Sequence, residues 1–550
     1  MTAVTAILNE AMGCHNAGDL SRAEALYHAV LEQDPGNLAA LVYLGAIVLG
    51  RGDGAAAMAY ADRALARDKT HTPAWNIKGL AATRLGQADE ALYYYERALR
   101  LDPGSFDAAA NRAATLLSLW RFDEAVKACG LLLRARPDFA AAHCILGNAL
   151  FESGRFEEAI PSFDAALAHA PRMAEAHNGR ANVLRRIGST EDAIAGYSAA
   201  ISCNPSFAEA YNNRGVAWQF LRRYEDAVAD YDAAIAISPD NADAHWNRAL
   251  VLLLRGDYER GWPEYEWRWK STALRHMART FAAPQWRGED ITGKTILIHA
   301  EQGLGDTLQF CRYVPLMAAR GARVVFQVHT TVLSLLRKLD GAAQVITAQD
   351  TIPAIDVHSP LLSLPAAFQT TVNTIPAQVP YIKVDPMVPI VWSARLGSRR
   401  GRRRIGLVWA GRPDHHNDHN RSLPVEKITP WLDLGLEVHC LQKEIKYADR
   451  VWATPRGVIF HDHELADMAD TAGLIANMDL VISVDTAPAH LAGACGRPTW
   501  VLLPYAPDFR WLTDRDDSPW YPTATLFRQE TPGDWTAVIA AVTDQLRAIG

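Results

Sequence analysis

Three short segments in the C-terminal half of the chain combine residue types that can do chemistry. The first is Gly303-Leu-Gly305-Asp306, which follows an apolar, β-branched stretch. Two glycines allow another group to approach the backbone closely, and a carboxylate at this position can take a proton from a hydroxyl group. Asp306 is equally suited to cap the helix that follows, because Asp is a favoured N-cap residue. The sequence leaves both roles open.

The second segment runs from Asp485 to His490 and reads D-T-A-P-A-H after another apolar stretch. Pro488 favours the start of a helix, and the free N–H groups of that first turn, with the Thr486 hydroxyl, can hold a phosphate. His490 is one turn into the helix and can face the same spot. The alternative is an Asp/Thr cap beside a packed histidine.

The third segment is the polar loop 410–422. Its three histidines, His415, His416 and His419, fall within five residues, which is not the helical spacing of a zinc motif. We therefore predict no metal site. Arg421, near the end of this loop, is expected to bind an anion.

Charge and cysteine usage exclude several classes of protein. The 550-residue chain has 55 basic and 62 acidic side chains and a net charge of −7, which does not suit a dedicated nucleic-acid binder. The basic run from Arg395 to Arg404 is therefore predicted to be a solvated hinge. The sequence shows no signal-peptide pattern, no long apolar span and no C-x-x-C pair among its seven cysteines. We expect a cytoplasmic protein with free thiols and no membrane span.

Alternating strands and helices must position the three segments. Strands are predicted at about 295–299, 323–328, 404–409, 436–441, 479–484 and 499–503. Helices are predicted at about 307–319, 465–477, 487–495 and 533–549. Such βαβ units form parallel sheets that bind ligands at the carboxyl ends of their strands. We expect two Rossmann-like lobes, 293–385 and 404–550, joined by a hinge at 386–403.

A 34-residue period organises the N-terminal half. It is marked by Pro103, Pro137, Pro171, Pro205 and Pro239. Alanines keep the same register, as do aromatic residues four positions after most of them. This is the period of the tetratricopeptide repeat, whose stacked helix pairs form an α-solenoid with a concave groove. We predict about seven repeats and a degenerate eighth over 1–270, followed by a connector at 271–292.

Asparagines recur in the first helices of the predicted repeats, although Asn is a poor helix former. They are Asn76, Asn111, Asn148, Asn178, Asn182, Asn212, Asn213 and Asn247. One interpretation is that their amides line the groove and hydrogen-bond the backbone of an extended peptide. The alternative is that some of them cap or bridge adjacent repeats.

The eighth repeat ends in an aromatic segment that contains Trp262, Tyr265, Trp267 and Trp269. A terminal repeat normally has a polar outer face. We therefore expect this segment to pack on the domain that follows, the alternative being a plain aromatic cap.

The Gly303–Asp306 and Asp485–His490 segments, with the stretch Gly493–Thr499, resemble the ADP-heptose–lipopolysaccharide heptosyltransferase family and its relatives fused to tetratricopeptide repeats. The resemblance covers roughly 293–550, and the layout is also similar to that of O-GlcNAc transferase. It implies a GT-B fold of two Rossmann-like lobes and metal-independent, inverting glycosyl transfer. No cofactor is implied, because the nucleotide sugar is a substrate. One departure is Ala487, where the family usually has Gly.

The resemblance also implies roles for single residues. Asp306 matches the carboxylate that acts as general base. Nucleotide-sugar binding is expected at Gly303, Gly305, Arg421, Lys443, Glu444, Asp485, Thr486 and His490. Within this set the match of Arg421 and Glu444 is looser, and Lys443 is an addition of ours as a phosphate partner.

These observations predict a glycosyltransferase. The acceptor hydroxyl would attack the anomeric carbon while Asp306 takes its proton, and the donor-binding groups would stabilise the leaving diphosphate. The first lobe is short for an acceptor-binding lobe, so we expect a protein acceptor held by the repeat groove. The alternatives are a non-catalytic scaffold and a transferase that acts on a lipid-linked sugar.

Overall fold

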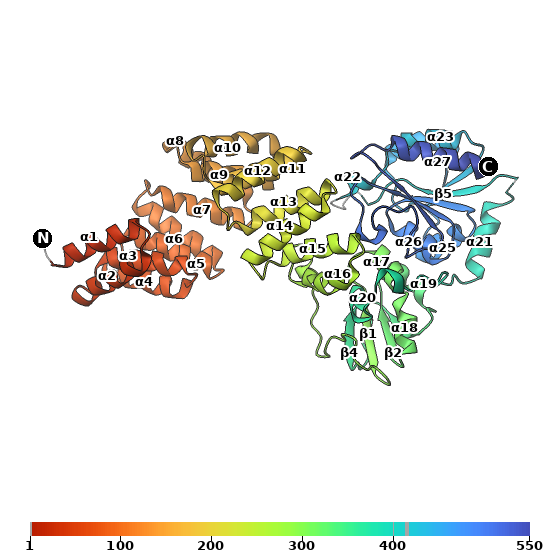
Figure 1. Ribbon diagram of the computed structural model, residues 1–550, viewed down its shortest axis with the longest axis horizontal. Coiled ribbons are helices and arrows are strands. Elements are labelled where there is room, and N and C mark those ends of the chain that lie inside the picture. Colours follow the sequence, from red (N-terminus) through yellow and green to blue (C-terminus); the bar gives the residue numbers. More distant parts are fainter. Residues whose placement is uncertain (1–2, 400, 413–416, 550) are drawn as a thin grey trace. The chain divides into compact units, whose positions relative to one another are not determined.

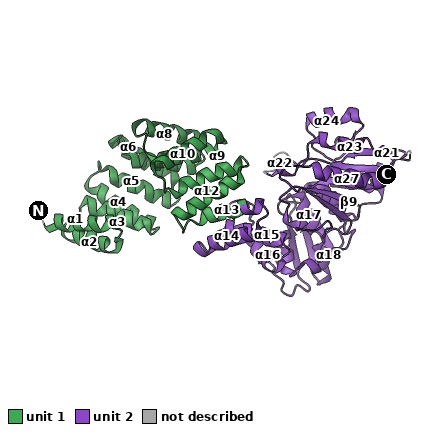
Figure 2. Ribbon diagram, turned by 45° about the horizontal axis from the view of Figure 1, so that its top comes forward, with its two compact units in different colours: residues 1–217 green, residues 218–550 purple. Residues whose placement is uncertain are grey.

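The computed structural model describes residues 3–399, 401–412 and 417–549. It divides into two compact units, Met1–Ala217 and Trp218–Gly550 (Figure 2). The division lies inside a repeat helix, so the end of the repeat array is part of the second unit. The last repeat belongs to the second unit because its apolar side chains are part of that unit's core.

The first unit is built from consecutive helices that pair as tetratricopeptide repeats (Figure 1). They are α1 (Ala3–Asn16), α2 (Leu20–Gln33), α3 (Leu38–Gly50), α4 (Gly54–Arg67), α5 (Thr72–Arg84), α6 (Ala88–Leu101), α7 (Phe106–Ser118), α8 (Phe122–Ala135), α9 (Ala140–Glu152), α10 (Phe156–His169), α11 (Ala174–Arg186), α12 (Thr190–Cys203) and α13 (Ala208–Phe220). From α3 onward, the first helix of each pair starts 34 residues after the previous one. The predicted α-solenoid with this period is confirmed.

Glycine and aromatic residues in the repeat register bring the helices into close contact. The ring of Phe163 is fully buried. A Cβ atom at Gly147 would lie 2.8 Å from this ring, and a Cβ atom at Gly179 would lie 2.4 Å from it. Interiors are close-packed, so only glycine fits at these two positions.

The second unit begins with the end of the repeat array. Its helices are α14 (Tyr224–Ile237), α15 (Ala242–Leu254) and α16 (Tyr258–Tyr265), followed by the 3-10 turn η1 (Glu266–Trp269). Trp262 and Tyr265 are 1% and 2% exposed. The Trp262 ring centroid lies 6.1 Å from that of Phe310, and the Tyr265 centroid lies 5.8 Å from that of Phe509. The expected packing on the α/β part is confirmed for these two aromatics.

A four-stranded parallel sheet with the order β3-β2-β1-β4 follows. Its strands are β1 (Thr295–His299), β2 (Arg323–Gln327), β3 (Ala342–Ile346) and β4 (Val357–Pro360). Its helices are α17 (Leu304–Phe310), α18 (Tyr313–Ala319), α19 (Thr330–Leu336) and α20 (Leu364–Ala367). The single helix predicted at 307–319 is therefore wrong: the structure has two helices there, and the first starts three residues earlier.

The second sheet has six parallel strands in the order β10-β9-β8-β5-β6-β7. Its strands are β5 (Arg404–Val408), β6 (Glu437–Cys440), β7 (Ile459–Phe460), β8 (Leu480–Val484), β9 (Thr499–Leu503) and β10 (Ala524–Arg528). The helices of this part are α21 (Met387–Leu396), α22 (Asp418–Arg421), α23 (Thr429–Leu432), α24 (Tyr447–Ala453), α25 (Met468–Ala476), α26 (Ala487–Ala494) and α27 (Thr536–Ile549). Counted from β5, this is the 3-2-1-4-5-6 order of a Rossmann fold, and the first sheet has the 3-2-1-4 part of it. The two predicted Rossmann-like lobes are confirmed.

The segment 386–404, predicted to be a hinge with a solvated basic run, differs from this prediction in two ways. It contains α21, whose Trp392 is fully buried because α25 offers Gly473 opposite the ring, where a Cβ atom would lie 2.6 Å from Trp392 Cδ1. Arg404 is also buried, since its Nε donates to Glu437 at 2.8 Å and its guanidinium reaches backbone carbonyls of α21 and the next residue. Solvation was the wrong prediction for Arg404.

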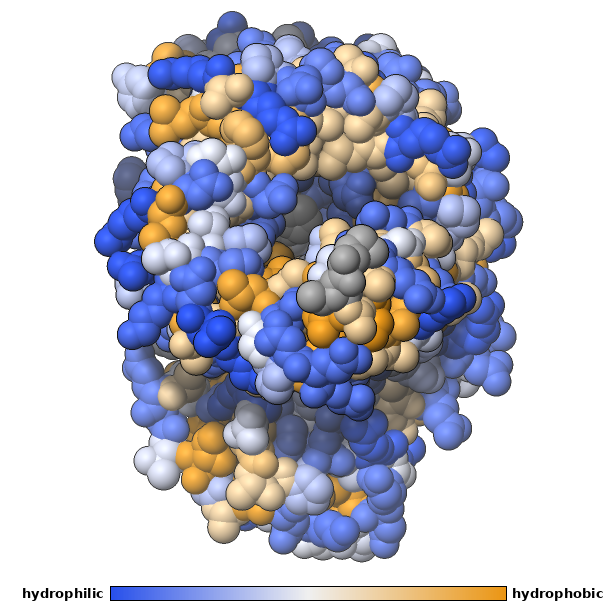
Figure 3. Space-filling model, turned by 90° about the vertical axis from the view of Figure 1, so that its left-hand side faces the viewer, coloured by the Kyte–Doolittle hydropathy of each residue, from blue (hydrophilic) through white to orange (hydrophobic). Residues whose placement is uncertain are grey.

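The distribution of hydrophilic and hydrophobic residues on the surface is as expected for helices that bury one face and expose the other to solvent. On the face shown in Figure 3, hydrophilic residues surround small groups of hydrophobic ones. In the described part of the chain, none of the helices has both the length and the apolar character needed to cross a membrane.

Candidate active site

Two of the sequence-predicted motifs, one from each sheet, lie against each other. Gly305 is on α17, which follows β1, and His490 is on α26, which follows β8. A Cβ atom at Gly305 would lie 2.9 Å from His490 Cδ2 and 3.8 Å from the Ala487 Cα atom. The glycine thus allows the two helices to pack at the carboxyl ends of their strands, where parallel sheets bind ligands.

Asp306 sits in the first turn of α17 rather than at its N-cap position, which Gly303 takes. One carboxylate oxygen of Asp306 accepts a 2.7 Å hydrogen bond from the Gly303 N–H, as the third residue of a capping box does. The other oxygen pairs with the Arg510 guanidinium. The side chain is 14% exposed. The carboxylate is therefore held in one orientation and still reached by solvent.

Arg510 is a site residue that the sequence analysis missed. It lies in the 3-10 turn η7 (Phe509–Trp511) after β9, and its Nη1 also pairs with Asp508 at 2.6 Å. The guanidinium thereby joins the carboxylate of the first lobe to the second lobe. The only sequence signal was a charged pair, Asp508 and Arg510, beside aromatic residues at a strand's carboxyl end.

Asp485 and His490 form the second half of the site. The His490 Nε2 atom lies 3.7 Å from Asp485 Oδ1, and its Nδ1 atom lies 3.0 Å from the Tyr521 hydroxyl. The ring stacks on Trp511 with centroids 5.3 Å apart. Burial opposes ionisation of Asp485, but its interactions with His490, Trp511 and Arg510 together outweigh burial and hold the pKa of this carboxyl below its usual value. Nearby, burial and the charge of Asp485 raise the pKa of Asp508.

Thr486 marks the start of α26 but does not cap it. Its hydroxyl lies 3.1 Å from the Ser483 hydroxyl and donates to the Val484 carbonyl at 3.2 Å. No side chain caps the first turn of α26 in the described structure. Its N–H groups therefore point out of the helix start without a side-chain acceptor, as in helix termini that bind anions.

Arg421 reaches the same place from the loop after β5. Its Nη1 donates to the Asp485 carbonyl at 3.2 Å, and its Nε lies 3.4 Å from Asp418 Oδ1. Strand β5 lies between β6 and β8, so this is the switch point of the strand order, where Rossmann folds bind nucleotides. His415 and His416 lie outside the described residues. Elsewhere in the described chain, no three His, Cys, Asp or Glu side chains are grouped to hold a metal ion.

Lys443 and Glu444 lie after β6 at the same edge of the sheet, but the structure does not bring them to the other site residues. The Lys443 ammonium donates to the backbone carbonyls of Asp462 and Leu465, at 2.9 and 2.5 Å. Both side chains are exposed. Within the described residues no hydrogen bond or ion pair joins either side chain to Arg421 or Asp485.

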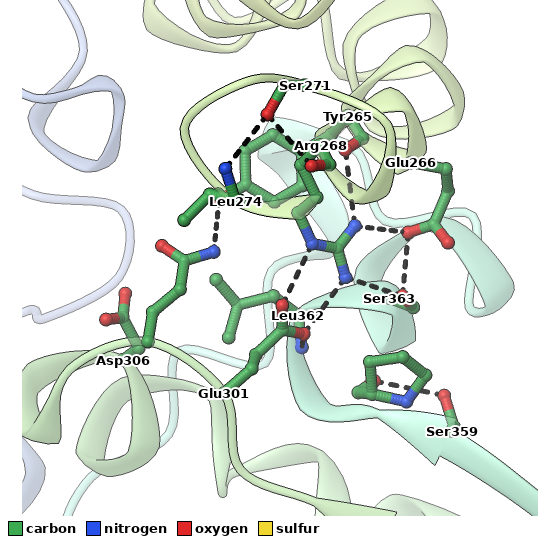
Figure 4. Close-up of polar contacts among 12 residues, drawn as sticks. Tyr265, Glu266, Arg268, Ser271, Leu274, Glu301, Asp306, Ser359, Leu362 and Ser363 are labelled. Carbon is green, nitrogen blue, oxygen red and sulfur yellow. Dashed lines mark hydrogen bonds and ion pairs between the residues drawn. The ribbon is translucent and has the colours of Figure 1, made fainter. Parts of the chain in front are cut away.

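In the first sheet the strand order reverses between β1 and β4, and side chains of the protein occupy this switch point (Figure 4). Glu301 follows β1 and accepts both guanidinium donors of Arg268 at 2.9 Å, together with the Leu362 N–H at 3.0 Å. Arg268 is fully buried and also bonds Glu266 at 2.7 Å and the Ser363 hydroxyl at 2.8 Å. Glu301 is thus fully engaged in a structural contact and is not free to act as a base.

The asparagines of the repeats divide between the two interpretations. Asn111 donates to Asn76 at 3.0 Å and Asn213 donates to Asn178 at 3.1 Å, so these amides bridge successive repeats. Asn182 accepts from the Tyr197 hydroxyl at 2.7 Å. Of the eight asparagines, Asn148, Asn178 and Asn182 line a pocket of the first unit. The remaining two are Asn212 on α13 and Asn247 on α15.

Comparison with protein families matches both parts of the chain. Tetratricopeptide repeat models match residues 16–81, 82–147, 144–208, 207–238 and 223–256. The glycosyltransferase family 9 (heptosyltransferase) model matches residues 465–533. The second match includes Asp485, Thr486, His490 and Arg510.

Similar proteins were found among curated proteins and solved structures. Protein FlbA of Caulobacter vibrioides is 28% identical over 332 residues, which are 54% of this chain and 54% of that protein, so the match spans about half of each. The APC/C hetero-tetramer Cut9–Hcn1 aligns with 49% of this chain and 54% of its own at 17% identity and a TM-score of 0.43. A tetratricopeptide repeat protein of Parabacteroides merdae aligns with 45% of this chain and 98% of its own at 20% identity and a TM-score of 0.39.

The repeat period, the two Rossmann-like sheets and the family matches agree with one another. The chain therefore contains tetratricopeptide repeats across residues 16–256 and a glycosyltransferase family 9 (heptosyltransferase) domain near its C-terminus.

Proposed function

We propose that the chain transfers a sugar from a nucleoside-diphosphate-sugar donor to a protein acceptor, with inversion and without a metal ion. The observation that carries this proposal is the contact between the Gly303–Asp306 and Asp485–His490 motifs, in which His490 lies against Gly305. A carboxylate and a set of anion-binding groups, contributed by different lobes, thereby share one site.

The donor diphosphate would bind at the switch point of the second sheet. Arg421 supplies a guanidinium there, α26 supplies uncapped N–H groups, and His490 supplies an imidazole. These groups can stabilise the negative charge that grows on the leaving diphosphate. In this proposal exposed Glu444 would bind the donor ribose, and Lys443 would reach a phosphate only by leaving its two carbonyl partners.

In the transfer step, the acceptor hydroxyl oxygen forms a bond to the anomeric carbon as the bond from that carbon to the phosphate oxygen breaks. The hydroxyl proton passes to Asp306, and the electron pair of the broken bond leaves with the nucleoside diphosphate. Arg510 would orient Asp306 for this step, because it holds one carboxylate oxygen while the Gly303 N–H holds the other. The protein acceptor is proposed to bind in the groove of the repeats.

The donor site is tested by substituting its two cationic groups. We expect Arg421→Ala and His490→Ala each to weaken nucleoside-diphosphate binding at least tenfold, because each removes a partner of the diphosphate. Titration calorimetry with UDP, GDP and ADP, and with CMP as a monophosphate for comparison, measures this. Arg456→Ala is the matched control and should bind normally, because among the described residues this exposed arginine of the same unit contacts only the carbonyl and ring of Trp452. Unchanged affinity in both site variants would remove Arg421 and His490 from the donor site.

A further inference from the structure

A pocket of about 500 Å³ opens among the repeats of the first unit. Its wall is formed by the first helices α7, α9, α11 and α13 and by the turn after α7, and it includes Trp120, Phe151, Glu152, Glu175, Asn178 and Glu209. The pocket therefore combines aromatic rings, a buried amide and carboxylates. It belongs to one compact unit and is separate from the candidate active site.

The charged side chains that line this pocket are all acidic. Three carboxylates line it, those of Glu152, Glu175 and Glu209, and no lysine or arginine is among its described lining residues. Glu209 accepts a hydrogen bond from Asn178 at 3.0 Å, and none of the three forms an ion pair in the described chain. Arg180, on α11, is engaged elsewhere, with Asp164 at 2.6 Å. The carboxylates are thus left to meet a cation from outside.

Trp120 gives a second, independent sign of a binding role. It occupies the repeat position at which Gly86 and Gly154 make the turn, and like them it has a positive φ, of 61°. A side chain in this conformation costs on the order of 1 kcal/mol. The indole does not recover this cost by burial, because it is 76% exposed at the pocket.

Arg222 shows that a residue other than glycine at this turn position can make a tertiary contact. It is the residue at the same repeat position three repeats later, and its φ is 59°. Its guanidinium donates to the Gln529 carbonyl at 3.1 Å and lies 4.1 Å from the Tyr505 ring centroid. In the repeat that contains Arg222, the strained backbone conformation therefore accompanies a tertiary contact of the side chain. We expect the same at Trp120, whose contact must come from a bound partner.

We propose that this pocket binds a lysine or arginine side chain presented by an extended segment of the acceptor protein. The cation would lie against the three carboxylates and the face of the Trp120 indole, which attracts positive charge. The amide of Asn178, 4% exposed, holds Glu209 in the pocket wall by its 3.0 Å hydrogen bond. Assigning the segment to the acceptor rests on the proposed function, but the binding itself needs nothing from the C-terminal site.

The test measures binding of fluorescein-labelled twelve-residue peptides to the full chain by anisotropy. The peptides share a Ser-Ala-Leu-X-Leu-Ala core in which X is Arg, Lys, Gln or Glu. We expect the Arg and Lys peptides to bind at least tenfold tighter than the Gln peptide, and this preference to shrink as salt is raised. The triple variant E152Q/E175Q/E209Q should lose the preference, and Trp120→Ala should weaken binding of the cationic peptides.

The matched control is E90Q/E157Q/E191Q, which removes the same charge from three exposed glutamates outside the pocket and should keep the preference. Equal binding of the Arg and Gln peptides, no binding of any peptide, or an unchanged preference in E152Q/E175Q/E209Q would each overturn the proposal. Calorimetry with nucleoside diphosphates on the same variants separates the two sites. A pocket variant that loses peptide preference but binds nucleotide normally localises the effect to the repeats, whatever the transfer assay shows.

Discussion

Replacing Asp306 by Asn should lower the rate of sugar transfer by roughly 100- to 10,000-fold, because the variant lacks the base that takes the hydroxyl proton. The fold should survive. Asn keeps a side-chain oxygen for the Gly303 N–H, and Arg510 keeps its 2.6 Å pair with Asp508. Transfer rate, donor affinity and melting temperature, measured on the same preparation, show whether the loss is confined to the chemical step.

Asp508→Asn is the matched control for this experiment. It removes the other carboxylate partner of Arg510, so it disturbs the same ion pair without removing the proposed base. We expect a rate loss at least tenfold smaller than that of Asp306→Asn. Near-normal transfer by a stable Asp306→Asn variant would show that this carboxylate only closes the first turn of α17 and fixes Arg510.

Removing the Arg268 guanidinium should destabilise the second unit by about 3–5 kcal/mol, as loss of one partner of a buried ion pair does. In Arg268→Met, the Glu301 carboxylate would stay buried with only the Leu362 N–H as a partner. Glu266 would keep Ser363 and Gln285. Denaturant unfolding followed by tryptophan fluorescence reports on this unit, since only Trp75 and Trp120 precede residue 218.

The double variant R268M/E301M separates charge from packing. It removes both members of the pair and replaces them with apolar side chains of similar length, so at least half of the lost stability should return. A double variant as unstable as Arg268→Met would mean that the guanidinium acts by packing and not by neutralising Glu301. A single variant of unchanged stability would contradict its role altogether.

The sequence predicted the parts of this fold that follow a period. The 34-residue spacing placed the repeat helices, because each repeat buries the same positions against its neighbours. Runs of apolar residues placed β1, β5, β8 and β9, since these strands are buried on both faces. All four outer strands, β3, β4, β7 and β10, were missed. β3 and β7 have partly exposed residues, and β4 has only four residues, so none of these three is marked by a long apolar run.

Residues of the candidate site could be proposed from the sequence where they stand close together in one motif. Asp306 and His490 were proposed from such motifs, and a tertiary contact between Gly305 and His490, which no spacing reveals, brings the two motifs together across the two lobes. Arg510 was missed because its partner Asp306 is 204 positions away in the chain. Lys443 was predicted to be a phosphate partner because it stands next to Glu444 in the sequence. In the structure its side chain instead hydrogen-bonds two backbone carbonyls of another loop.

The most direct test of the central claim is nucleotide release from a panel of ADP-, UDP-, GDP- and CMP-linked sugars incubated with the purified full chain. We predict that one class of donor is consumed, that Arg421→Ala and His490→Ala each slow its consumption, and that sugar appears on a protein when the acceptor is present. Absence of consumption for every donor, with and without acceptor protein, would contradict the assignment as a working transferase and favour a scaffold that keeps only the fold.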